Sequence, residues 1–166
     1  MSRSDIEIRQ ATPDDAEGIV RVHYDAVHIT AAQNYDKSIL SEWSSPNSDR
    51  ISKLQDQISD KAENEVMLVA IRNRVVIGFA EAVPSKCELR AVYVDPMCGR
   101  TGVGRLLLSA LETLVVERGA DELWLDSSLT AQAFYAANGY IDEGTGMHRL
   151  RSGQEMQYVK MRKRLR

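Results

Sequence analysis

Three short apolar runs with very short connections constrain the fold of this chain more than any other feature. The runs cover residues 66–70, 75–82 and 87–94, and their alternating or β-branched character is typical of strands. The segments between them, 72–74 and 84–86, are too short for the crossover that parallel strands require. The sequence therefore predicts three consecutive antiparallel strands.

The remaining elements follow from periodicity and capping residues. Thr12 caps a first helix that we expect to end near Ile29, and the next twenty residues show no regular period. Apolar residues at helical spacing over 103–115 predict a strongly amphipathic helix that ends at Gly119. We also expect strands near 6–8 and 123–125, helices near 49–58 and 130–137, and a hairpin of 148–151 with 156–161. One strand-helix-strand unit beside segregated strands indicates an α/β (α+β) fold with a mixed sheet.

The length and charge limit what the chain can be. Its 166 residues correspond to a single domain, 1–166, and the net charge of −3 argues against a protein that coats nucleic acid. The last seven residues hold five basic side chains, so the rest has 16 basic against 24 acidic residues, or −8. Met161 and Leu165 alternate with Arg162 and Arg164, which predicts a final edge strand more readily than a nucleic-acid-binding arm.

The expected cellular setting is the cytoplasm. The first ten residues lack the apolar core of a secretory signal, and no apolar run is long enough to cross a bilayer. Only Cys87 and Cys98 are present, too few for a disulfide framework and without the spacing of a zinc site. We expect two reduced thiols, no metal and no membrane association.

A glycine-containing loop between the third strand and the amphipathic helix carries the functional signal. A helix N-terminus preceded by glycines can bind an anion, because unpaired backbone N–H groups converge where the helix dipole is positive. Leu107 stands where a dinucleotide fingerprint needs its third glycine, and Arg105-Leu106 replaces the Lys-Ser/Thr of a phosphate loop. Taken alone, the loop is equally consistent with a tight turn that packs a helix on a sheet.

With its flanking segments, the loop resembles the signature of the GCN5-related N-acetyltransferase (GNAT) superfamily. That signature reads Arg or Gln, two residues, Gly, one residue, then Gly or Ala; Gly102 and Gly104 match it. Gly99 stands at the Arg/Gln position, and Arg100 is the alternative cation. The segment 127–140 resembles the family's second motif through Ser128, Ala131, Phe134-Tyr135 and Gly139-Tyr140.

This resemblance implies a mostly antiparallel seven-stranded sheet flanked by about four helices. It also implies transfer of an acetyl group from acetyl-coenzyme A to a primary amine of a small molecule or peptide, by direct attack in a ternary complex. The cofactor-binding residues that it implies are Val92, Tyr93, Val94, Gly99, Arg100, Thr101, Gly102, Val103, Gly104, Ser128, Ala131 and Phe134.

The resemblance further assigns the catalytic roles. Tyr135 is the expected acid for the departing thiolate. Glu88, eleven residues before Gly99, is the expected base, with Glu81 or an ordered water chain as alternatives. The acceptor pocket is expected to draw on Tyr24, Tyr35, Trp43 and His148.

Two questions stay open at this point. A homodimer is compatible with the family, but nothing in the sequence decides the oligomeric state or names the acceptor. Because Gly99 differs from the Arg or Gln of the family signature, a catalytically silent acyl-coenzyme A binding or sensory module is the alternative. The intact Phe134-Tyr135 pair favours an enzyme.

Overall fold

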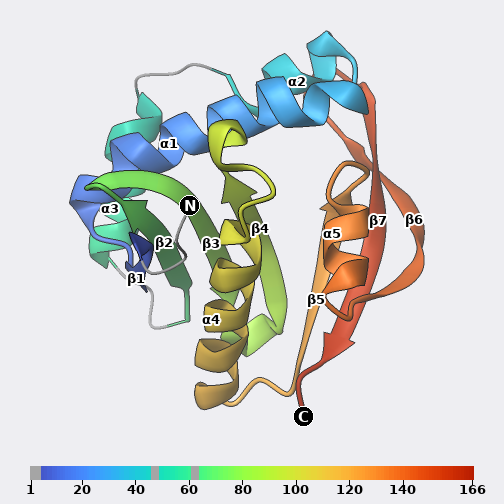
Figure 1. Ribbon diagram of the computed structural model, residues 1–166. Helices are drawn as coiled ribbons and strands as arrows, with labels where there is room; N and C mark the ends of the chain where they lie inside the picture. Colours follow the sequence, from blue (N-terminus) through green and yellow to red (C-terminus); the bar gives the residue numbers. More distant parts are fainter. Residues whose placement is uncertain (1–4, 46–48, 61–63) are drawn as a thin grey trace.

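A seven-stranded sheet forms the framework of the computed structural model, which describes residues 5–45, 49–60 and 64–166 (Figure 1). The strand order is β1-β2-β3-β4-β5-β7-β6, and only β4 and β5 run parallel. This confirms the predicted mixed, mostly antiparallel sheet and the three consecutive antiparallel strands. The strands are β1 (Glu7–Gln10), β2 (Val66–Arg72), β3 (Val75–Val83), β4 (Glu88–Val94), β5 (Glu122–Ser128), β6 (Ile141–Arg149) and β7 (Glu155–Arg164).

Helices cover both faces of this sheet. Buried leucines of α4 and Tyr135 of α5 pack on one face, whereas α1 and α3 pack on the other through Ile19, Val22 and Ile58. The helices are α1 (Ala16–Asp25), α2 (Lys37–Trp43), α3 (Asp49–Asp60), α4 (Val103–Glu117) and α5 (Gln132–Ala137). The sequence did not predict α2, and the expected first helix is broken after Asp25 by a π turn at Ala26–Thr30.

The parallel strands β4 and β5 diverge from a single registered pair, Glu88 with Trp124 (Figure 1). A β-bulge contributes to this: Glu81 pairs with Ala91 and Ala82 with Leu89, so the bulge inserts Arg90 into β4. Bulges bend a strand and increase its local twist. Beyond the bulge, the edge of β4 that faces β5 is therefore free of a strand partner.

The basic C-terminal strand is not at the edge of the sheet, so that prediction was wrong. The chain turns after β6 and places β7 between β5 and β6, because the register with β5 runs from Glu122–Arg164 to Ser128–Tyr158. The basic side chains pair with the acidic body. Arg162 contacts Glu122 and Glu143, and the Lys163 Nζ lies 2.8 Å from the Glu112 carboxylate.

The two cysteines are free thiols, as the sequence predicted: Cys98 is buried and Cys87 is partly exposed. Within residues 5–45, 49–60 and 64–166, no helix has the length and apolarity that a membrane span requires.

Candidate functional site

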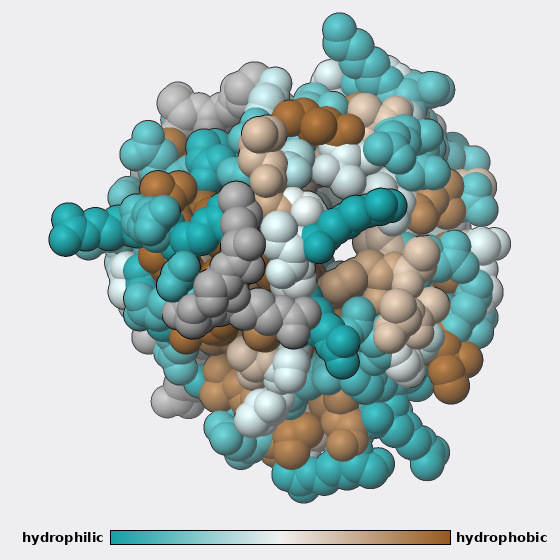
Figure 2. All heavy atoms as spheres, viewed as in Figure 1, coloured by the Kyte–Doolittle hydropathy of each residue, from teal (hydrophilic) through white to brown (hydrophobic). Residues whose placement is uncertain are grey.

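A cleft of about 710 Å³ opens between the diverging strands β4 and β5. It is lined by the end of β4, the glycine loop, the first turn of α4, the start of α5 and parts of the α1–α2 region. Figure 2 shows the molecule hollowed between the start of α4 and α5. All of the predicted cofactor-binding residues except Thr101 line this cleft.

The glycine loop presents the N-terminus of α4 to the cleft. Gly102 has φ +88° and is the N-cap residue, a conformation that glycine adopts without a steric cost. The Thr101 hydroxyl donates to the Cys98 carbonyl (2.6 Å). This hydrogen bond stabilises the turn, although Thr101 itself does not line the cleft. The first N–H groups of a helix have no partner within the helix, so this end of the cleft can bind an anion such as a phosphate.

Gly104 has a packing role that the motif alone did not show. A Cβ built at this residue would lie 3.2 Å from the Phe134 ring and 3.5 Å from a Val94 methyl. The absence of a side chain therefore lets α4 approach α5 and β4 closely, and any side chain here would project among residues that line the cleft.

Two arginines add positive charge to the cleft lining. Arg100, the expected substitute for the missing Arg or Gln at position 99, lines it together with Arg105. Sequence reasoning missed Arg105, although a cation one residue after the last motif glycine was a usable signal. It also missed Thr130, Asn138 and three residues of the segment after α1, namely Ala26, Thr30 and Ala31.

Tyr135, the expected acid, lies behind the cleft lining. Its side chain is only 4% exposed and packs edge-on against Phe134 and Tyr140, at ring-centroid distances of 5.1 and 5.5 Å. Burial, and to a lesser degree the Tyr93 hydroxyl, raises the pKa of Tyr135. The phenol therefore keeps its proton through the neutral and mildly alkaline range, as an acid must.

Trp43 is the one predicted acceptor residue that lines the cleft. Its ring meets the Tyr93 ring edge-on, with ring centroids 6.4 Å apart. Burial raises the pKa of Tyr93. The two side chains form an aromatic wall on the side of the cleft that faces α2.

Tyr35 holds chain segments together and does not line the cleft. Its hydroxyl donates to the Gln157 carbonyl (2.7 Å) and accepts from the Leu129 N–H (2.8 Å), and burial raises its pKa. Tyr24 instead packs on the His28 ring at 4.1 Å. The region after α1 is thereby tied to the turn that follows β5.

Replacing Tyr35 by phenylalanine is expected to lower the free energy of unfolding by about 2 kcal/mol. The change leaves a carbonyl and an N–H without their partner, and each unsatisfied buried group costs about 1–3 kcal/mol before water or relaxation compensates. Urea denaturation measures the difference. Tyr24→Phe is the matched control and should stay within about 0.5 kcal/mol of the original chain; equal stabilities for the two variants would contradict this role.

His148 also lies outside the cleft lining, on β6. Its Nε2 is 3.4 Å from an Asp126 carboxylate oxygen, and its ring stacks on Tyr158 with centroids 4.2 Å apart. The side chain is 51% exposed.

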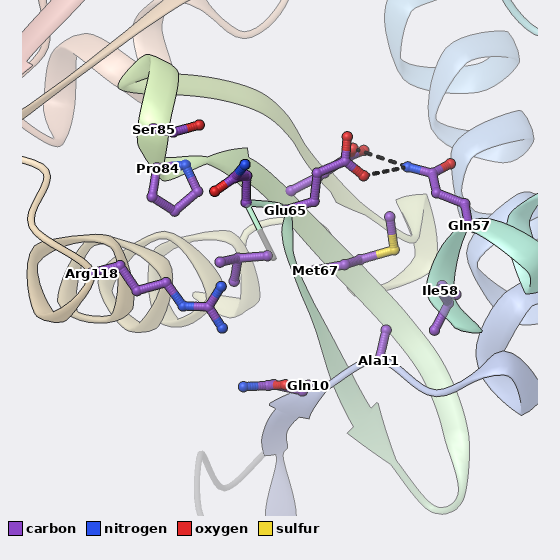
Figure 3. A pocket seen from close by; sticks show the side chains of 12 residues that line it. Gln10, Ala11, Gln57, Ile58, Glu65, Met67, Pro84, Ser85 and Arg118 are labelled. Atoms are coloured by element: carbon purple, nitrogen blue, oxygen red, sulfur yellow. Dashed lines mark hydrogen bonds between the residues drawn. The ribbon is translucent and has the colours of Figure 1, made fainter. Parts of the chain in front are cut away.

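Neither of the two predicted bases, Glu81 and Glu88, lines the cleft. Glu81 lines a second hollow of about 580 Å³, where the Gln57 amide donates to Glu65 (3.2 Å) and Glu81 (3.5 Å) (Figure 3). Arg90 contacts Glu65, Glu81 and Glu88 at 2.9, 3.4 and 3.4 Å. Burial raises the pKa of Glu81 although Arg90 opposes the shift.

The position of Glu88 along its strand explains why it is not in the lining. Glu88 begins β4, where β4 and β5 are still paired, and four residues separate it from Val92, about 13 Å along an extended strand. The structure therefore does not bring Glu88 to the opening that Val92 lines.

Comparisons with known proteins agree with this geometry. The family described as acetyltransferase (GNAT) domain matches residues 27–165. An uncharacterized N-acetyltransferase, YafP, of Escherichia coli K12 is 28% identical over 137 residues, 82% of each chain. The spermidine N(1)-acetyltransferase of Thermoplasma acidophilum is 24% identical over 146 residues, 84% of this chain and 91% of that protein.

Solved structures show the same fold. A GCN5-related N-acetyltransferase from Rhodopseudomonas palustris superposes with a TM-score of 0.85 at 27% identity, covering 99% of this chain and 98% of that one. The PaiA N-acetyltransferase of Thermoplasma acidophilum, solved in complex with coenzyme A, gives a TM-score of 0.76 at 23% identity, with 99% of both chains covered.

Proposed function

Because this chain belongs to the acetyltransferase (GNAT) domain family and is an acetyl-coenzyme A-dependent acyltransferase, we propose that its acceptor is a primary amine of a small molecule or peptide. The amine attacks the thioester directly while both substrates are bound. The observation that supports the proposal is the cleft between β4 and β5, whose lining includes a helix start that suits a phosphate and the aromatic pair Tyr93 and Trp43.

The cleft residues fit acetyl-coenzyme A by its chemistry. The N–H groups at the start of α4 and the charges of Arg100 and Arg105 suit the pyrophosphate. The pantetheine arm contains amide groups, and the free edge of Val92–Val94 offers backbone partners to such an arm as it would to an added strand.

The reaction then needs groups that polarise the thioester carbonyl and protonate its sulfur. A backbone N–H of the β4 segment polarises the carbonyl oxygen as negative charge develops on it. The amine nitrogen forms the new bond to the carbonyl carbon, the carbon–sulfur bond breaks, and the Tyr135 hydroxyl protonates the departing thiolate. The raised pKa of Tyr135 keeps that proton available.

An acceptor screen tests this function. Purified protein is incubated with acetyl-coenzyme A and single amines, beginning with spermidine because a curated relative acts on it, and free coenzyme A thiol is measured. Amine-dependent thiol release supports the proposal. Thiol release that no amine in a broad panel increases would contradict an amine acceptor.

Arg105→Ala is expected to raise the Kd for coenzyme A about fivefold, since one charge-assisted contact to phosphate is partly exposed and contributes about 1 kcal/mol. The effect should shrink as salt is added. Calorimetric titration measures both. Arg151→Ala, an exposed arginine in the turn between β6 and β7, is the control; a Kd for Arg105→Ala that matches this control would remove Arg105 from the phosphate site.

A further inference from the structure

A histidine–aspartate pair lies on the sheet face beside the opening, and the proposed chemistry has not used it. His148 of β6 and Asp126 of β5 approach to 3.4 Å between Nε2 and Oδ2, and the Tyr158 ring of β7 stacks on the imidazole. Three strands thus fix the position of the ring. The two side chains are 51% and 26% exposed, so a substrate can reach them.

The pair is close to the cleft along the strands that carry it. Ser128 lines the cleft, and Asp126 precedes it by two residues, so the two side chains share one face of β5 about 7 Å apart. Tyr158 is the register partner of Ser128. Ser128 at the cleft edge therefore has Tyr158 as its neighbour on the adjacent strand, and Tyr158 stacks on His148.

This face is the one from which an acceptor can approach. Leu125 and Ser127, which alternate with Asp126, are buried, and Leu125 belongs to the core beneath α4 and α5. Asp126 consequently points to the opposite side of the sheet. A cofactor that enters beside α4 and α5 leaves the opposite side of the opening free for the amine.

Resting on the proposed acetyl transfer, we propose that His148 is the general base that takes a proton from the acceptor ammonium group, and that Asp126 positions it. A carboxylate beside Nε2 favours the tautomer that carries its proton on that nitrogen, which leaves Nδ1 with a lone pair.

The protons balance with the groups already named. Nδ1 takes one proton from the ammonium, the free amine forms the nitrogen–carbon bond, and the carbon–sulfur bond breaks. The thiolate receives the Tyr135 proton. The second proton of the attacking nitrogen passes to water, Tyr135 regains a proton from water, and the imidazolium releases its proton to solvent.

The alternative bases are engaged elsewhere. Glu81 and Glu88 both contact the Arg90 guanidinium, and neither lines the cleft. Asp126 lies 3.4 Å from the His148 ring and Tyr158 stacks on it. Lys160 is the register partner of Asp126, but its Nζ lies over the Trp124 ring at 5.7 Å. Asp126 is therefore the group that orients the imidazole.

The test compares pH profiles of kcat/KM for an amine that the wild-type chain acetylates. His148→Gln is expected to lose about 100-fold in kcat/KM, in line with the usual contribution of a general base, and to lose the acidic limb of the profile. Its Kd for acetyl-coenzyme A should stay within twofold. Added imidazole should restore part of the activity of His148→Ala, a rescue that a purely structural side chain would not show.

Two further variants separate the roles. Asp126→Asn should lower kcat/KM and leave the Kd for acetyl-coenzyme A within twofold, because the imidazole loses the group that positions it. Tyr158→Phe retains the stacked ring and should keep the limb where it is. In Glu88→Gln the limb should also persist.

The proposal is overturned if His148→Gln keeps both the rate and the acidic limb, or if the limb disappears in Glu88→Gln. Either result would leave acetyl transfer by the wild-type chain intact and remove only the histidine base. Failure of the wild-type chain to release thiol with any amine would instead overturn the proposed function, and this base with it.

Discussion

Gly104→Glu is expected to raise the Kd for coenzyme A at least 100-fold. The new Cβ would meet the Phe134 ring at 3.2 Å, and the carboxylate would stand in the first turn of α4, where the phosphates are proposed to bind. A negative charge at that point repels the pyrophosphate and competes with it for the N–H groups of the helix start. A 100-fold change corresponds to about 2.8 kcal/mol, and calorimetric titration of coenzyme A measures it.

Gly104→Ala is the matched control for this variant. It introduces the same contact with Phe134 but no charge, and the ring can yield by the few tenths of an ångström that the contact requires. We expect a Kd increase of less than about tenfold and a thermal midpoint close to that of Gly104→Glu. An unchanged Kd for the glutamate variant would show that the phosphates do not bind at this helix start.

The elements that could be predicted are those whose causes are local. The connection at residues 72–74 is short and Asn73 and Arg74 both adopt positive φ, at 51° and 65°, so the hairpin of β2 and β3 is encoded in a few neighbouring residues. The glycine loop and α4 are local in the same sense. The cofactor-binding residues predicted from the motifs line the cleft, except Thr101, but the lining also includes residues that sequence reasoning missed, such as Thr130 and Asn138.

The elements that sequence reasoning missed depend on distant contacts. α2 has only seven residues, too short to be stable alone, and it is held through Leu40 in a cluster with Tyr35 and Met156. The place of β7 inside the sheet was also hidden, because alternation along a strand does not reveal which strands flank it. Both features depend on residues far apart in the sequence, such as Leu40 with Met156 for α2 and Glu122 with Arg164 for β7.

The same distinction between local and distant causes applies to the candidate site. Motif spacing located the loop and α5, but it placed Glu88 at the opening without account of the divergence of β4 from β5. That divergence depends on a bulge at Arg90, which periodicity does not reveal. The His148–Asp126 pair joins β6 to β5 across β7. Its formation therefore could not be predicted from the sequence without the strand order.

Tyr135→Phe is expected to lower kcat about 100-fold while the Kd for acetyl-coenzyme A changes less than twofold. The variant keeps the ring that packs between Phe134 and Tyr140 and removes only the proton that the thiolate is proposed to take, a contribution of about 100-fold or more for a general acid. Rapid-quench measurement of acetyl transfer, together with titration of the cofactor, separates the two quantities.

Tyr140→Phe is the control, because Tyr140 lies in the same aromatic cluster but its hydroxyl donates to Glu112 (3.0 Å). It should lose stability and keep kcat within about threefold, since its proton belongs to a structural hydrogen bond. Equal kcat values for Tyr135→Phe and the wild-type chain would show that water or another group protonates the thiolate.

The pH dependence gives an independent check on Tyr135. An acid must be protonated to act, so its activity is lost as pH rises through its pKa, and burial raises that pKa above the ordinary tyrosine value of about 10. The rate of acetyl transfer by the wild-type chain should therefore not fall through deprotonation of Tyr135 until the pH exceeds about 10. Below that pH, the profiles of the wild-type chain and Tyr135→Phe should have the same shape. A limb near pH 8 that disappears in this variant would contradict the burial of the hydroxyl, because only a group with a lowered pKa could produce it.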